Sequence, residues 1–177
     1  MNNSKIQWLS RSVLMISIFA VMISSCKKDD PDPEYVGSWA TTQAIFSGDV
    51  ILQIKDIMTF TKDSYTDVAQ ILDESTNEYI DYLKLIGTLT VDETIMHIDI
   101  NEVGLSSVDL LSGKPTGTIV MYKEGTTQFD NIFAQTGQTQ TFGFEYSISE
   151  NTMTIYSDYN SDGDYNDEDE AIVYTKQ

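Results

Sequence analysis

The strongest constraint on this chain is the regular alternation of apolar and polar side chains over much of its length. Successive side chains of a β-strand point to opposite faces of a sheet, so this alternation predicts strands with one buried and one solvated face. The turn at residues 149–151 separates two such runs and predicts a hairpin. The apolar positions of the alternating runs are Leu83, Leu85, Leu89 and Val91; Met96, Ile98 and Ile100; Phe142, Phe144, Tyr146 and Ile148; and Met153 and Ile155, with Val173 following later.

Other segments lack a clear period. Residues 49–56 and 68–72 are ambiguous between strand and short helical turns, and residues 126–141, rich in Thr and Gln, predict a loop interrupted by the apolar segment 129–133. Many short strands joined by hairpins, without strong helices, favour an antiparallel sandwich or barrel. The expected fold class is therefore all-β, in one domain over residues 35–177, which is long enough to bury a sizeable core.

The N-terminus has the pattern of a secretory signal that ends before the only cysteine, Cys26. Lys5 and Arg11 supply positive charge, residues 12–23 form an apolar run, and two serines precede the cysteine. The run is too short for a membrane-spanning helix, which takes roughly 20 residues. Ile-Ser-Ser-Cys resembles the lipobox of bacterial lipoproteins, which implies a signal peptide over residues 1–25 and lipid attachment to Cys26. The alternative is an ordinary cleaved signal with an incidental cysteine.

Residues 26–34 are expected to form the lipidated cysteine and a short tether, because KKDDPDPE has nothing to bury. In Bacteroidetes, lysine followed by acids directly after the lipidated cysteine resembles a surface-export signal. The resemblance implies a protein anchored in the outer membrane and exposed at the cell surface. The alternative is a solvated spacer on a protein of the periplasmic face.

Beyond residue 25 the chain is strongly acidic and contains no arginine. The whole chain has 10 Lys and Arg against 28 Asp and Glu; without Lys5 and Arg11, 8 lysines remain against 28 acids, a formal charge of −20. Such a surface repels nucleic acid, and the lack of arginine argues against phosphate recognition. With Cys26 lipidated and His97 the single histidine, the sequence also argues against thiol chemistry and histidine-cluster metal sites.

Four short motifs carry a family resemblance: GSW at residues 37–39, MTFTKDSY at residues 58–65, YSISENTMTI at residues 146–155, and the ending YTKQ. Their order resembles the lipocalin-like lipoproteins of Bacteroidetes. The resemblance implies a calycin-type, antiparallel up-and-down barrel in which Trp39 closes one end. In lipocalins proper an arginine of a late strand often packs against this tryptophan. Small barrels are filled by side chains and larger ones enclose a ligand, and both interiors are compatible with the sequence.

An acidic segment near the C-terminus, residues 158–169 (DYNSDGDYNDED), fits a calcium-loop pattern. Oxygen donors recur at the spacing of EF-hand and dockerin loops, and Gly163 stands where such loops turn sharply. The last position is Asp rather than the EF-hand's Glu, and the flanks have the character of strands rather than helices. We therefore expect a structural calcium ion, the alternative being an acidic solvated turn. The expected ligands are Asp158, Asn160, Asp162, Asp164 through its carbonyl, Asn166 and Asp169.

Signatures of catalysis are weak. His97 and Asp99 share the outward face of a strand, but no Gly-x-Ser-x-Gly elbow accompanies them, so an exposed histidine is the simpler interpretation. The adjacent acids at residues 73–74 and 92–93 point apart and do not form a general acid–base pair. We expect a non-enzymatic, lipid-anchored binding module for a small apolar molecule or a glycan. The alternative is a structural or accessory subunit of a cell-surface protein complex.

Overall fold

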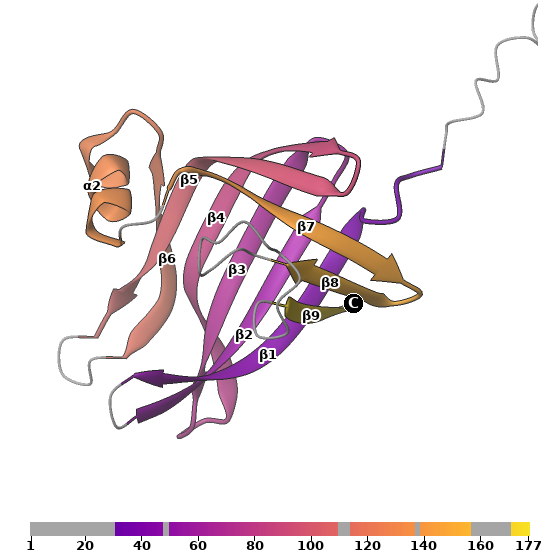
Figure 1. The fold of residues 1–177 in the computed structure, drawn as a ribbon. Helices are drawn as coiled ribbons and strands as arrows, with labels where there is room; N and C mark the ends of the chain where they lie inside the picture. Colours follow the sequence, from indigo (N-terminus) through magenta and orange to yellow (C-terminus); the bar gives the residue numbers. More distant parts are fainter. Residues whose placement is uncertain (1–30, 48–49, 110–113, 137–138, 157–170) are drawn as a thin grey trace, which may run out of the picture. The chain divides into compact units, whose positions relative to one another are not determined.

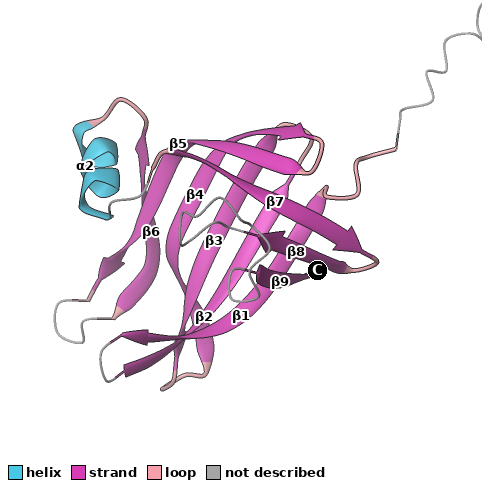
Figure 2. Ribbon diagram, viewed as in Figure 1, coloured by secondary structure: helices cyan, strands magenta, loops and turns pink. Residues whose placement is uncertain are grey.

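The computed structural model describes residues 31–47, 50–109, 114–136, 139–156 and 171–177. Cys26, the signal and the acidic segment 158–169 lie outside the described residues. The described part folds into nine strands and one helix (Figures 1 and 2). These are β1 (Gly37–Ser47), β2 (Val50–Phe60), β3 (Ser64–Asp73), β4 (Glu78–Asp92), β5 (Ile95–Val108), β6 (Pro115–Lys123), α2 (Thr127–Thr136), β7 (Thr141–Ser149), β8 (Thr152–Tyr156) and β9 (Ala171–Lys176).

Eight of the strands close into an antiparallel barrel. Hydrogen-bonded neighbours follow chain order from β1 to β5, then β7 pairs with β5, and β8 and β9 lead back to β1. Strand β6 lies outside this ring and pairs with the C-terminal half of β5. The predicted all-β, up-and-down barrel is thus confirmed, with β6 and α2 inserted between β5 and β7 (Figure 1). The predicted hairpin at residues 149–151 is also present, between β7 and β8.

The seam between the first and last strands is the shortest ladder of the ring. Strands β1 and β2 pair along the whole of β1. Within the described residues, β1 and β9 pair only where Trp39 faces Lys176 and Ala40 faces Thr175. The barrel is therefore closed by a short contact between the two ends of the domain sequence.

The segments that were ambiguous from sequence are strands. The described part of residues 49–56 belongs to β2, and residues 68–72 belong to β3, without helical turns. Their alternation is obscured because apolar residues stand on both faces of each strand. In β2 Ile51 is exposed while Ile54 lines the cavity, and in β3 Val68 lies on the face opposite the cavity-lining Ala69. Asp56, in phase with Ile54, adds a polar residue to the interior face of β2.

Strand β5 contains a bulge that resets its alternation. Ile98 and Ile100 are fully buried, and the next buried residue of the strand is Val103 rather than the residue two positions on. The ladder to β4 shifts register just before Gly87. At that point the backbones of β4 and β5 approach so closely that a Cβ on Gly87 would overlap the carbonyl oxygen of Asp99. The bulge keeps apolar residues on the interior face beyond residue 100.

The predicted loop over residues 126–141 is wrong in its central part, which forms helix α2. The Oγ1 of Thr126 accepts a hydrogen bond from the backbone N–H of Phe129 at 3.3 Å, as an N-cap does. Phe129, Ile132 and Phe133 recur at helical spacing and pack against the core. The Thr- and Gln-rich composition concealed this helix, because capping and three spaced apolar residues outweigh weak helix propensity.

Large side chains fill the end of the barrel at which β1 begins. Trp39 is fully buried, and its indole N–H donates to the carbonyl oxygen of Tyr35 at 2.8 Å. The Nζ of Lys176 lies 5.1 Å from the centre of the Trp39 ring, so a lysine of the last strand supplies a cation beside this tryptophan. The fully buried side chains of the core are Trp39, Phe60, Tyr65, Met96, Ile98, Ile100, Val103, Phe129, Met153 and Tyr174.

Candidate functional site

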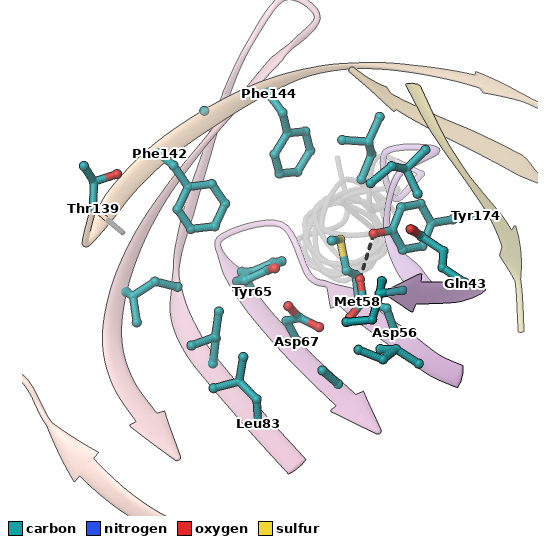
Figure 3. A pocket seen from close by; sticks show the side chains of 18 of the residues that line it. Gln43, Asp56, Met58, Tyr65, Asp67, Leu83, Thr139, Phe142, Phe144 and Tyr174 are labelled. Carbon is teal, nitrogen blue, oxygen red and sulfur yellow. Dashed lines mark hydrogen bonds between the residues drawn. The ribbon is translucent and has the colours of Figure 1, made fainter. Parts of the chain in front are cut away.

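A cavity of about 990 Å³ lies inside the barrel (Figure 3). Each strand of the ring contributes to its wall, and Phe133 of α2 joins them. The volume is at the upper end of the range of about 300–1,000 Å³ that is typical of small-molecule sites. The lining residues are Gln43, Ile45, Ile54, Asp56, Met58, Tyr65, Asp67, Ala69, Leu83, Leu85, Ile100, Phe133, Thr139, Phe142, Gly143, Phe144, Ile155, Ile172 and Tyr174.

The cavity is closed at one end and accessible at the other. Along β1, exposure rises from zero at Trp39 to 41% at Ile45, which lines the cavity. Along β3, Tyr65 is buried, whereas the inward-facing Ala69 is half-buried. Solvent therefore reaches the cavity from the end opposite Trp39.

The wall of the cavity is mainly aliphatic and aromatic. Tyr65, Phe142 and Phe144 form an aromatic wall, in which the ring centres of Tyr65 and Phe142 are 6.3 Å apart and those of the two phenylalanines 6.4 Å apart. Among the lining residues, the only charged side chains are those of Asp56 and Asp67, and none is basic. An apolar pocket with a few convergent polar groups is the usual form of a small-molecule site.

The two carboxyl groups project from neighbouring strands. In the β2–β3 ladder Asp67 faces Met58 and Asp56 faces Ala69, so the two acids are diagonal neighbours on the inner face. The hydroxyl of Tyr174 donates a hydrogen bond of 2.7 Å to Oδ2 of Asp56, across β1 (Figure 3). Three strands thus bring an acidic pair and a tyrosine together.

Asp67 is the unusual member of this group. The residue is only 9% exposed, and its Oδ1 has no hydrogen-bond partner among the described residues. Burial, and then the neighbouring Asp56, raise the pKa of Asp67 well above the usual value, although the nearby Tyr65 hydroxyl opposes the shift. Burial, followed by the charge of Asp67, also raises the pKa of Tyr65 well above its usual value. Asp67 therefore retains its proton to a higher pH than an isolated aspartate does.

A metal site within the barrel has little support from these residues. Two carboxylates fall short of the six to eight oxygen ligands that calcium takes. No group of three or more His, Cys, Asp or Glu residues suited to a metal occurs in the part of the chain that the structure describes. The predicted calcium ligands, Asp158, Asn160, Asp162, Asp164, Asn166 and Asp169, lie outside that part.

Of the other residues singled out from sequence, Trp39 lies at the closed end and does not line the cavity. His97 and Asp99 are exposed on β5, as predicted for an outward strand face. Oδ1 of Asp99 accepts a hydrogen bond from the hydroxyl of Thr141 at 3.2 Å, which is a structural contact between β5 and the start of β7. Cys26 lies outside the described residues.

Sequence reasoning missed Asp56, Asp67, Tyr65 and Tyr174 as a group. The signal that could have found the two acids is their phase, because each falls on the apolar face of its strand. Their proximity follows from the β2–β3 register and from the closure of the barrel by β9, neither of which a single sequence specifies.

Searches against protein-family models and against curated proteins found no match for this chain. Among the described residues, no helix has the length and apolar character needed to cross a membrane. The features of this chain that bear on function are therefore its cavity and its sequence motifs.

Proposed function

We propose that this protein is a non-enzymatic, lipid-anchored binding module of the cell envelope, whose barrel holds a small, largely apolar molecule. The observation that carries the proposal is the cavity of about 990 Å³ inside the closed barrel. Its aliphatic and aromatic wall favours an apolar molecule over a glycan, since a sugar needs many more hydrogen-bonding partners than this wall offers.

The anchor is supported by the sequence alone. The signal-like residues 1–25, the Ile-Ser-Ser-Cys motif and the charged tether that follows agree with a lipid on Cys26 and an outer-membrane, surface-exposed location. Mass spectrometry of the N-terminal peptide tests this part of the proposal. An unmodified Cys26, or cleavage at another position, would contradict the anchor without affecting the cavity.

The binding role is tested with N-phenyl-1-naphthylamine, a neutral apolar dye whose fluorescence rises in apolar sites. We expect saturable binding to the purified protein. Ala69 lines the cavity on β3, and Ala69→Trp places a large ring in this space, so it should weaken binding by about tenfold or more.

The matched control is Val68→Trp, on the opposite face of the same strand, which should bind the dye as the parent protein does. Leu85→Trp, on β4, fills the cavity from a second side if Ala69→Trp misfolds, and circular dichroism checks the fold of each variant. Absence of dye binding, or equal loss with Val68→Trp, would overturn the proposal of an interior binding site.

A further inference from the structure

We propose that the cavity recognises an amphipathic organic cation, with Asp56 and Asp67 binding a protonated amine and the apolar wall holding the rest of the molecule. This inference rests on the proposed function and adds a chemical class of ligand to it. It depends on the placement of the acids, on the Oδ1 of Asp67, which has no hydrogen-bond partner among the described residues, and on the lack of a basic side chain among the described lining residues.

The acids are positioned to act together. They lie diagonally on adjacent strands with their side chains directed into the cavity (Figure 3). Asp56 is oriented by the 2.7 Å hydrogen bond that its Oδ2 accepts from the Tyr174 hydroxyl. An ammonium group carries three donors and can bridge two carboxylates.

Asp67 provides the sharpest indication of a missing partner. It is nine-tenths buried, it points into the cavity, and its Oδ1 accepts no hydrogen bond from the described residues. Buried acceptors in folded proteins are nearly always satisfied, and an orphaned one is costly. A ligand that donates a hydrogen bond to Oδ1 removes this cost when it binds.

Charge favours a cation over a neutral donor. None of the described residues that line the cavity is a lysine, arginine or histidine, so no basic side chain among them balances the two acids. Tyr65, Phe142 and Phe144 present ring surfaces to the same space, and aromatic faces attract cations electrostatically. With only two carboxylates present, an organic ammonium fits these residues better than an inner-sphere metal ion does.

Binding is expected to displace a proton. The groups that act on Asp67 are Asp56 on β2 and Tyr65 on its own strand, and Tyr174 on β9 lies beside both of these. The lining residues of β4 and β7 are uncharged. None of these groups is basic, so a cation stabilises the ionised form of Asp67 while a neutral ligand does not. Affinity for an amine should therefore rise with pH through the range in which Asp67 releases its proton.

The experiment compares octylamine, octan-1-ol and octanoate, which share one alkyl chain and differ in the head group, by displacement of N-phenyl-1-naphthylamine at pH 7. We expect the amine to bind about 10- to 100-fold more tightly than the alcohol, as a charge-assisted hydrogen bond implies, and octanoate most weakly. Asp67→Asn and Asp56→Asn should each reduce this amine-to-alcohol preference to a few-fold or less. Asp92→Asn, at an exposed end of β4, is the matched control and should retain the preference.

The outcomes separate this inference from the proposed function. Equal affinities for amine and alcohol, or a preference that survives both Asn substitutions, would overturn the amine site while the dye still reports an apolar cavity. Binding of calcium chloride alone that is abolished by Asp67→Asn would overturn it in favour of a metal. Failure of the dye itself to bind would contradict the proposed function instead.

Discussion

Replacing Asp67 by Leu should stabilise the protein, although it removes a residue of the proposed site. In the folded protein Oδ1 of Asp67 is buried without a hydrogen-bond partner among the described residues, whereas water solvates it in the unfolded chain. Leaving such a group unsatisfied costs about 1–3 kcal/mol. Leu has a similar shape and would meet Met58 and Leu85, the register neighbours of Asp67 on β2 and β4. We expect the free energy of unfolding to rise by about 1–3 kcal/mol.

Urea unfolding followed by circular dichroism at pH 7 measures the effect. With an m-value of about 2 kcal/mol/M, the midpoint should move upward by about 0.5–1.5 M while the slope stays constant. Asp92→Leu removes the same charge at an exposed position and should change stability by no more than about 0.5 kcal/mol. A destabilised or unchanged Asp67→Leu variant would refute the reasoning, because it would mean that Oδ1 is satisfied in the folded state.

The stabilisation by Asp67→Leu should also depend on pH. The pKa of Asp67 is higher in the folded protein than in the unfolded chain. This carboxyl group therefore contributes most to the stability of the folded state at pH values below its unfolded pKa, and the contribution is lost as the pH rises toward its folded pKa. The stabilisation by Asp67→Leu should therefore be larger at pH 7 than near pH 3, at which the carboxyl is largely protonated in both states. An equal gain at the two pH values would contradict the raised pKa.

Two further predictions concern the frame of the barrel. Gly87→Ala should lower the free energy of unfolding by about 1–3 kcal/mol in the same assay, because the new Cβ would overlap backbone atoms of Asp99 at the β5 bulge. Unchanged stability would show that the backbone at the bulge can shift at little cost. Lys176→Met should lower stability by about 0.5–1 kcal/mol through loss of the cation beside Trp39, whereas Lys176→Arg should preserve it; equal behaviour of the two variants would count against the cation–π contact.

The sequence predicts those strands in which apolar and polar side chains alternate regularly. Met96, Ile98 and Ile100 alternate with exposed residues, and this part of β5 was predicted from that pattern. Parts of β2 and β3 were ambiguous because apolar residues stand on both faces there, so period-two alternation fails. Asp56 and Asp67, at the centre of the candidate site, are polar residues on interior faces, which the alternation rule does not predict.

Other features lay beyond sequence reasoning for different physical reasons. Helix α2 is stabilised by the Thr126 cap and by packing of Phe129, which local composition does not reveal. The bond from Tyr174 to Asp56 joins residues 118 positions apart and exists only because the barrel closes. The size of the cavity depends on how eight strands curve together, and the same alternation would also suit a filled barrel.

The short seam between β1 and β9 has a consequence for the order of folding. Its two register pairs join residues 39–40 to residues 175–176, so almost the whole domain must be in place before they form. Contacts of such long sequence separation carry a large loop-closure cost and form slowly. We therefore expect the β1–β9 seam to form last during folding, and the amide hydrogens bonded across it to exchange before those of the longer ladders. Tyr174 lies on β9 and donates a hydrogen bond to Asp56. Each opening of the seam therefore also breaks the hydrogen bond that orients Asp56 within the acidic pair.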